Sequence, residues 1–148
     1  MIKKMKTSKA GIDLIKQFEG CRLEAYLCPA LVWTIGYGHT NGVKKGDKIT
    51  ELQAETFLTI DLQKFEKAIN ELVTVPINQN MFDSLASFVF NIGIGAFKGS
   101  TLLKLLNKKE YGLAACQFER WNKAGGKILS GLMKRRAAEK KLFITPVN

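Results

Sequence analysis

The stretch FEGCRLEAYLCPALVWTIGYGHT, residues 18–40, decides the fold prediction, because the residue pattern changes here from helical to extended. After Gly20 the chain becomes rich in Tyr, Val, Trp, Thr and Ile, interrupted by proline and glycine, which is typical of a β-hairpin. Glu19, Cys28, Thr34 and His39 all lie within this stretch, and His39 is the only histidine of the chain. So many reactive groups in one hairpin predict a functional site.

The pairing of the hairpin places two of these side chains together. If residues 29–31 form the loop, Cys28 faces Val32 across the ladder and Tyr26 faces Thr34. Cys28 and Thr34 then share one face as diagonal neighbours, about 7–8 Å apart at Cα, a spacing that a water molecule bridging thiol and hydroxyl would fit. The alternative is that both are ordinary strand residues behind a packed opposite face.

Cys28 is the obvious candidate nucleophile, but a protease-like thiol needs a base within hydrogen-bond reach. His39 is the sole candidate, and it lies eleven residues further on. At roughly 3.3 Å per residue, an extended strand carries it well away from the hairpin loop. A Cys–His dyad is therefore disfavoured, and we expect His39 to pair with a carboxylate instead, with Asp61 as the partner.

The other cysteines do not indicate a disulfide or a metal site. Cys21, Cys28 and Cys116 form an odd set without a CxxC pair, and one histidine cannot complete a zinc ligand set. We expect Cys21 and Cys116 to be small buried hydrophobic residues. No metal and no cofactor are expected.

Glu19 lies at the last turn of a predicted helix that Thr7 or Ser8 can cap and Gly20 can end. The negative end of the helix dipole disfavours an ionised carboxylate there. A carboxyl that keeps its proton near neutral pH can act as a general acid. A solvated glutamate at a helix end is the alternative.

The rest of the chain is mainly helical. An Asn-Gly turn at residues 41–42 leads to a third short strand within residues 43–49, so a sheet of about three strands is expected. Thr50 and Gln53 resemble a capping box, and the helix behind them has apolar residues at helical spacing up to Pro76. Further helices are predicted near residues 80–92, 102–106 with Ser100 as cap, 110–121 and 132–143.

These elements predict an α+β fold in one domain, residues 1–148. Residues 20–50 would form a small antiparallel sheet lobe and residues 51–75 a long connecting helix. Residues 76–148, together with the N-terminal helix, would form a mostly helical lobe.

The formal charge of +10 predicts attraction to an anionic polymer: nucleic acid, an acidic membrane surface or a cell-wall polymer. No nucleic-acid motif is present, so nucleic acid is not expected. Lysines and Asp13 interrupt any apolar run near the N-terminus, which predicts synthesis in the cytoplasm without a signal peptide. The basic helix at residues 132–143 is either a surface helix with Leu132, Leu142 and Phe143 packed inward or a membrane-contacting helix.

Taken together, these residues resemble the phage-type lysozymes of glycoside hydrolase family 24. Glu19, eight residues, Cys28, five residues and Thr34 are similar to that family's catalytic Glu, Asp or Cys, and Thr. The stretches FNIGIGAFKGSTLLKLLN and FERWNKAGGKILSGLMKRRAAEKKLF resemble the helical lobe of the same enzymes. The resemblance extends from about Ser8 to Phe143.

The resemblance implies a lysozyme-like fold with the active-site cleft between the lobes, and hydrolysis of the β-1,4 bond between N-acetylmuramic acid and N-acetylglucosamine in peptidoglycan. Glu19 would protonate the leaving oxygen, while Cys28 and Thr34 would hold the attacking water. The resemblance also implies that the helical lobe lines the cleft with Phe90, Asn91 and Ser100 and places Arg135, with Arg136 as second choice, near Glu19.

Cysteine in place of aspartate leaves several roles open for Cys28. A thiolate could act as base, as electrostatic stabiliser or as nucleophile, whereas inverting glycosidases usually use two carboxylates about 6.5–9.5 Å apart. We favour water positioning with inversion. A lytic transglycosylase, a non-catalytic wall-binding module and a membrane-active antimicrobial protein are the alternatives.

The resemblance also implies partners and a route to the substrate. Peptidoglycan would be the principal partner, with peripheral contact to an anionic outer membrane as an additional expectation. A monomer is expected. A phage holin would open the inner membrane so that the enzyme reaches the cell wall from the cytoplasm.

Overall fold

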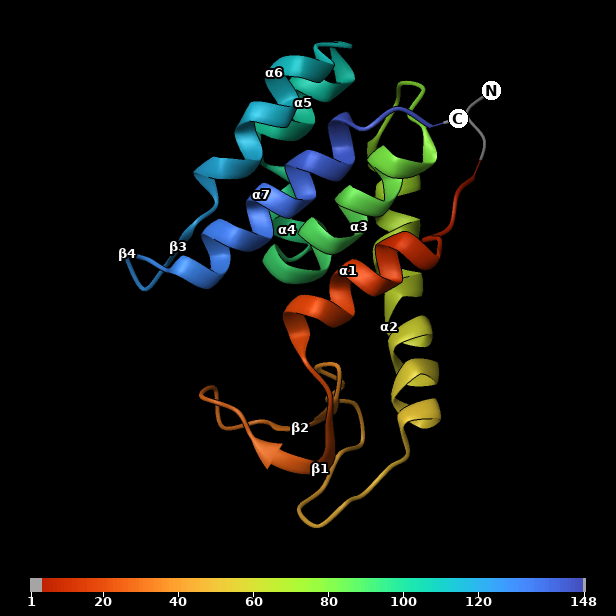
Figure 1. The fold of residues 1–148 in the computed structure, drawn as a ribbon, viewed down its shortest axis with the longest axis vertical. Coiled ribbons are helices and arrows are strands. Elements are labelled where there is room, and N and C mark those ends of the chain that lie inside the picture. Colours follow the sequence, from red (N-terminus) through yellow and green to blue (C-terminus); the bar gives the residue numbers. More distant parts are fainter. Residues whose placement is uncertain (1–3, 148) are drawn as a thin grey trace. The chain divides into compact units, whose positions relative to one another are not determined.

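The computed structural model describes residues 4–147 and has the expected α+β composition (Figure 1). In chain order its elements are α1 (Lys9–Glu19), β1 (Arg22–Leu27), β2 (Trp33–Gly36), α2 (Glu51–Leu72), α3 (Gln79–Ile92), α4 (Ile94–Lys98), α5 (Thr101–Asn107), α6 (Tyr111–Gln117), a 3-10 turn (Phe118–Arg120), β3 (Lys123–Ala124), β4 (Lys127–Ile128) and α7 (Ser130–Ile144).

The chain forms two units, a sheet unit of Ile15–Gln63 and a helical unit of the described residues before and after it. The unit boundary falls within α1, after Leu14, and within α2, before Lys64. The division of the chain into a sheet lobe, a connecting helix and a helical lobe at residues 50 and 75 stays a prediction.

The sheet unit contains a two-stranded antiparallel sheet, so the expectation of three strands was wrong. β1 pairs with β2, and only Lys48 of the following segment forms a bridge, opposite Glu24. Positive φ angles at Gly42 and Gly46 explain the difference, because they wind residues 40–47 into consecutive turns. The chain therefore reaches β1 with only a few residues in extended form.

The capping box before α2 is confirmed. The Thr50 backbone N–H donates to Gln53 Oε1 at 2.9 Å, and the Gln53 backbone N–H donates to Thr50 Oγ1 at 3.1 Å. The predicted apolar stripe is also present, with Leu58, Leu62 and Ile69 buried along the 22 residues of the helix. α2 thus begins at a capping box and buries one apolar face, as its sequence predicts.

The helical unit has its core around α3, which runs alongside α7 (Figure 1). Phe88 of α3 contacts Phe118 edge to face at 5.1 Å between ring centroids, and Phe118 contacts Phe143 of α7 at 5.4 Å. All three rings are almost completely buried. The helix near residues 110–121 ends earlier than expected, at Gln117, and continues as the 3-10 turn.

Two elements of this unit were not predicted: α4 and the β3–β4 hairpin. Ala124 pairs with Lys127, and Gly125 and Gly126 between them both have positive φ, as a two-residue hairpin turn requires. The Gly-Gly pair is itself a hairpin signal that sequence reasoning could have used.

The buried face of α7 corrects a second expectation. Phe143 is buried as predicted, but Leu132 and Leu142 are only half-buried, and the other buried residues are Arg135, Arg136 and Glu139.

The expectation that Cys21 and Cys116 are small buried hydrophobic residues was also wrong, because both are exposed. None of the described helices combines the length and the apolar character needed to span a membrane.

Candidate active site

The β1–β2 hairpin brings Cys28 and Thr34 together, and its predicted register is confirmed. Tyr26 pairs with Thr34, and the Cys28 backbone N–H donates to the Val32 carbonyl oxygen at 3.0 Å. The loop closes through Leu31, whose N–H donates to the Cys28 carbonyl at 2.8 Å and whose φ of 62° lies in the left-handed region. The register therefore fixes which side chains face one another.

Hydrogen bonds to the Cys28 thiol lower its pKa from the ordinary cysteine value. The backbone of Val32 makes the largest contribution, partial burial opposes it, and Ala30 and the Thr34 hydroxyl lower the pKa further. The Thr34 side chain is buried and also lies 3.0 Å from the Val32 carbonyl oxygen. Thiol and hydroxyl are thus in direct contact, and the hairpin favours the thiolate.

Glu19 is the last residue of α1 and belongs to the same sheet unit. The helix ends there because Gly20 has a φ of 70°. Gly38 follows β2 with a φ of 86°, and a Cβ at this position would lie 3.6 Å from Glu19 Oε1. The backbone at Gly38 therefore approaches the half-buried Glu19 carboxyl closely.

His39 is held by Asp61, as expected. Its Nδ1 lies 2.8 Å from Asp61 Oδ2, and its ring stacks on Phe57 with centroids 4.2 Å apart. His39 is buried and forms a backbone bridge with Ile35 at the end of β2. The pair thus joins the end of β2 to α2, with the Nδ1 atom occupied by the carboxylate.

A further group in the sheet unit escaped sequence reasoning. Lys16, one helical turn before Glu19, pairs with Glu55 and lies 5.7 Å from the ring centroid of Tyr37. Tyr37 also forms a side-chain hydrogen bond with Cys21, and burial, Cys21 and Glu51 raise the pKa of its phenol.

Three residues of the helical unit were expected to contact the substrate. Ser100 is buried and caps α5: its Oγ donates to the Phe97 carbonyl at 2.7 Å and accepts from the Leu103 N–H at 3.1 Å. Phe90 is half-buried and contacts the ring of Phe65 at 5.3 Å.

Asn91 is exposed at the end of α3 and lines a cavity of about 400 Å³. Other residues that line it are Ile92, Trp121, Lys123, Leu129 and Leu132.

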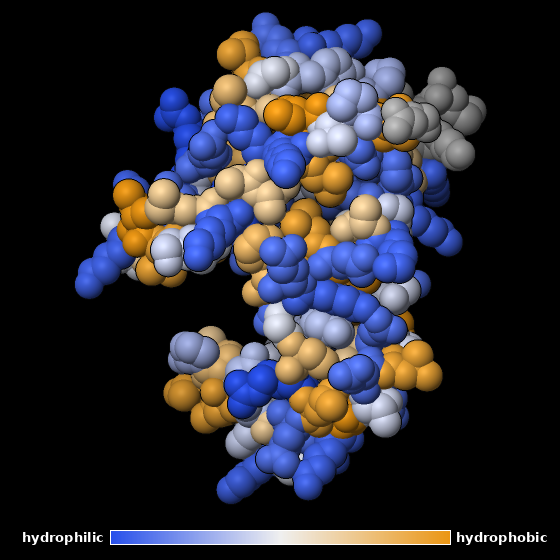
Figure 2. Space-filling model, viewed as in Figure 1, coloured by the Kyte–Doolittle hydropathy of each residue, from blue (hydrophilic) through white to orange (hydrophobic). Residues whose placement is uncertain are grey.

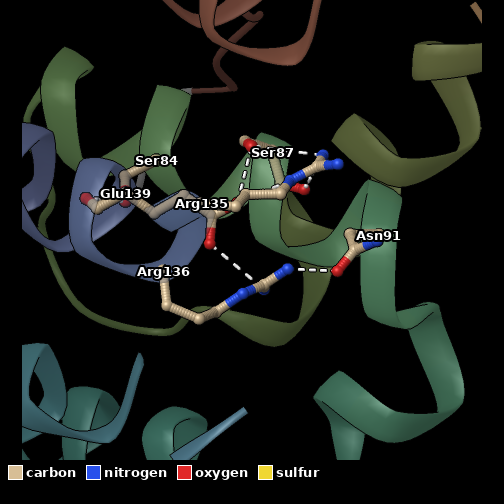
Figure 3. A network of polar contacts seen from close by, with 6 residues as sticks. All are labelled: Ser84, Ser87, Asn91, Arg135, Arg136 and Glu139. Atoms are coloured by element: carbon tan, nitrogen blue, oxygen red, sulfur yellow. Dashed lines mark hydrogen bonds and ion pairs between the residues drawn. The ribbon is translucent and has the colours of Figure 1, made fainter. Parts of the chain in front are cut away.

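Arg135 and Arg136 belong to a buried polar network between α3 and α7 (Figure 3). Arg135 donates to the Ser87 carbonyl at 3.0 Å and to Glu139 Oε2 at 3.3 Å. Arg136 Nη1 lies 3.1 Å from Glu139 Oε1, and Arg136 Nη2 donates to Asn91 Oδ1. Burial raises the pKa of Glu139, and Arg136, Ser87 and Arg135 offset part of the rise.

Glu139 was missed by sequence reasoning, although its spacing of three and four residues from the two arginines is typical of ion pairs within a helix.

Among residues 4–147 the structure contains no group of three or more His, Cys, Asp or Glu side chains arranged to hold a metal ion. The sheet unit itself offers a carboxyl at Glu19, a thiol at Cys28 and a hydroxyl at Thr34.

The chain is similar in sequence and in structure to known proteins. The family model described as phage lysozyme matches residues 16–139. The endolysin of Acyrthosiphon pisum secondary endosymbiont phage 1 is 50% identical over 94% of this chain and 98% of its own length. The endolysin of Bacillus phage PZA is 48% identical, and the match spans 94% of this chain but only 55% of that protein.

Among solved structures, the muramidase domain of SpmX from Asticaccaulis excentricus superposes with a TM-score of 0.91 at 43% identity. The match covers 95% of this chain and 99% of that domain. This chain and that domain are therefore similar in both sequence and fold.

Proposed function

The chain belongs to the phage lysozyme family, and from this premise we propose that Glu19, Cys28 and Thr34 are its catalytic residues. The activity is that of an endolysin, a lysozyme-type glycoside hydrolase that degrades bacterial peptidoglycan. The bond cleaved is the β-1,4 linkage between N-acetylmuramic acid and N-acetylglucosamine. The direct contact between the Cys28 thiol and the Thr34 hydroxyl, in the unit that contains Glu19, carries the assignment of residues.

In this mechanism Glu19 donates its proton to the leaving glycosidic oxygen. Cys28 and Thr34 hold a water molecule that attacks the anomeric carbon from the opposite face, and the thiolate form of Cys28 accepts a proton from it. Attack by water on the β-linked sugar inverts the configuration and releases the α-anomer.

Residues of both units take supporting parts in the proposal. His39 and Asp61 hold the end of β2 on α2, so that the strand carrying Thr34 keeps its position. Phe90 and Asn91 contact the substrate, and Arg135, or Arg136 in its place, supplies a cation to the reaction. Ser100 ranks below Phe90 and Asn91 as a residue that contacts the substrate, because its hydroxyl already caps α5.

We extend the proposal to access and assembly. Peptidoglycan lies outside the inner membrane, so a chain made in the cytoplasm needs that membrane to be opened, and a holin supplies the opening. The protein acts as a monomer and makes peripheral contact with an anionic outer membrane through its basic surface.

Glu19→Gln is the first test. We expect peptidoglycan hydrolysis to fall about 10²- to 10⁴-fold, because the amide cannot donate the proton. The measurement is the release of muropeptides from purified sacculi, with circular dichroism to show that the fold is retained. Undiminished release would remove Glu19 from the mechanism, and killing of bacteria that survives the change would indicate a membrane-active protein.

The products separate the remaining alternatives. Mass spectrometry of the muropeptides distinguishes a hydrolase, which adds water, from a transglycosylase, which leaves an anhydro sugar. Proton NMR during the first minutes of the reaction identifies the anomer released. The α-anomer agrees with direct attack by water, whereas the β-anomer would require a covalent intermediate and would overturn the inverting mechanism.

A further inference from the structure

The segment before α1, residues 5–8, is held by side chains of α2 and α3 within the helical unit. Asn70 of α2 binds the backbone of Met5 twice: its Oδ1 accepts from the Met5 N–H and its Nδ2 donates to the Met5 carbonyl oxygen, both at 2.9 Å. Glu66, one helical turn earlier on α2, accepts from the Thr7 N–H at 2.8 Å. These side chains bind the backbone of the segment and so fix its course.

Asp83 of α3 holds the residue from which α1 begins. It is completely buried and accepts hydrogen bonds from the Ser8 backbone N–H at 2.8 Å and from the Ser8 hydroxyl. Gln79, one turn earlier on α3, donates to Asp83 Oδ1 and to the Lys6 carbonyl oxygen, each at 2.8 Å. A buried carboxylate bound by several donors keeps its partners in a defined geometry.

The contact with Asp83 extends into the first turn of α1. The Ser8 carbonyl oxygen accepts from the Ile12 N–H at 3.0 Å, so the residue that Asp83 holds is joined directly to the helix. Gly11 lies three residues after Ser8 on the same face, and a Cβ there would lie 2.8 Å from Asp83 Cβ. Asp83 therefore fixes both the position of α1 along its axis and its rotation.

α1 is one continuous helix of 11 residues, and Glu19 is its last residue (Figure 1). At about 1.5 Å per residue its two ends lie about 15 Å apart, and the helix cannot change this length without breaking its own hydrogen bonds. A shift of its start along the axis therefore moves Glu19 by a similar amount. In a catalytic group, misplacement by about 1 Å can reduce the rate about a hundredfold.

We propose that Asp83 is a positioning residue for the reaction: by holding Ser8 it sets where α1 places the Glu19 carboxyl relative to the glycosidic oxygen. Asp83 acts through α1 and not by contact with the sugar. The proposal rests on Glu19 as the general acid, as proposed above, and adds the residue that fixes its position. It predicts a loss of kcat without a loss of affinity for the cell wall.

Asp83→Ala and Asp83→Asn test this role together. Alanine leaves the Ser8 N–H without its acceptor, so we expect kcat on purified sacculi to fall about tenfold or more while KM stays within about twofold. Asparagine keeps an oxygen for the Ser8 N–H and for Gln79, which both donate to Oδ1, and its amide can donate to the Ser8 hydroxyl. Asp83→Asn should therefore restore most of kcat, and equal losses in the two variants would overturn the proposal.

Asn107→Ala is the matched control for lost stability. Asn107 also binds backbone groups of the helical unit: it donates to the Leu72 carbonyl oxygen and accepts from the Thr74 N–H, both at 2.9 Å. These partners lie at the end of α2 and just after it, and not on α1. We expect Asn107→Ala to lower the thermal stability but to keep kcat. A loss of kcat equal to that of Asp83→Ala would show a general effect and contradict the proposal.

Amide hydrogen exchange shows whether the start of α1 has been released, because the Ile12 N–H should then exchange faster. Unchanged kcat in an Asp83→Ala protein with faster exchange at Ile12 overturns the proposal. If Asp83→Ala does not fold, Gln79→Met takes its place, since it removes both Gln79 hydrogen bonds at a half-buried position. Its kcat should fall with KM unchanged, and an unchanged kcat again overturns the proposal.

Glu19→Gln separates this proposal from the catalytic assignment on which it rests. Loss of hydrolysis in Glu19→Gln with unchanged kcat in Asp83→Ala would overturn only the positioning role of Asp83. Full activity in Glu19→Gln would overturn the catalytic assignment and, with it, the role of Asp83.

Discussion

At the scale of single residues, Cys28 owes its chemical character to neighbours in its own hairpin. The Val32 and Ala30 backbone groups and the Thr34 hydroxyl hydrogen-bond to the thiol and favour its ionised form. Cys21 and Cys116 are more exposed, and neither lies in a comparable hairpin loop. The lowered pKa of Cys28 therefore comes from its hydrogen bonds and not from exposure to solvent.

Thr34→Val tests this difference. Valine has the shape of threonine but no hydroxyl, so the thiolate loses one hydrogen bond and the pKa of Cys28 should rise. Alkylation by iodoacetamide, followed against pH in a Cys21→Ser, Cys116→Ser background, should therefore shift to higher pH. A profile that does not move would show that Thr34 contributes nothing to the ionisation of Cys28.

At the scale of elements, the start of α1 is fastened to α3 through Asp83. This buried carboxylate accepts hydrogen bonds from the Ser8 backbone N–H and from Gln79 Nε2, both at 2.8 Å, and from the Ser8 hydroxyl. Gly11 permits the approach, because a Cβ there would lie 2.8 Å from Asp83 Cβ and 2.6 Å from Thr7 Cγ2. The packing of α1, the helix that ends at Glu19, against α3 thus requires a glycine at position 11.

Gly11→Ala should therefore destabilise the protein by about 1–3 kcal/mol, because the added methyl overlaps with its neighbours. Gly112→Ala in α6 is the matched control: nothing lies within 4 Å of its Cβ, so the change should be neutral or stabilise by up to about 1 kcal/mol. Urea denaturation of both variants measures the difference. Equal stabilities would contradict the close packing at Gly11.

At the scale of the whole molecule, the positive charge is unevenly divided. The sheet unit contains five Lys and Arg and six Asp and Glu, and the rest of the chain contains 18 and seven. The net charge of +10 therefore comes from the helical unit. Hydrophilic residues cover much of the visible face of that unit, while hydrophobic ones gather at the tip of the β1–β2 hairpin, where Leu31 is 77% exposed (Figure 2).

This distribution predicts that salt weakens the activity on anionic cell walls. The hydrolysis rate should fall as the ionic strength rises from about 0.01 to 0.15 M, because the Debye length shortens from about 30 to 8 Å. Lys104→Glu with Lys108→Glu, on the helical unit, should reduce the rate at low salt more than Lys44→Glu with Lys45→Glu on the sheet unit. A rate independent of salt, or equal losses from both pairs, would contradict the prediction.

The sequence predicts well wherever the cause is local. The end of α1 at Gly20, the capping box at Thr50 and the register that pairs Tyr26 with Thr34 depend on residues a few positions apart, and all are confirmed. The prediction of a third strand was wrong because Gly42 and Gly46, which have positive φ angles, turn residues 40–47 instead of extending them. Membership of the phage lysozyme family also follows from sequence, because its motifs recur in order along the chain.

By itself, then, the sequence determined the α+β class, the hairpin and the triad of Glu19, Cys28 and Thr34 as candidates. Only the tertiary structure revealed that Arg135, Arg136 and Glu139 of α7 are buried, although charged residues usually lie at the surface. Their burial is tolerated because Ser87 and Asn91, 45 to 52 residues earlier in the chain, supply partners. Polar groups become compatible with a core only through such distant contacts, which no local pattern records.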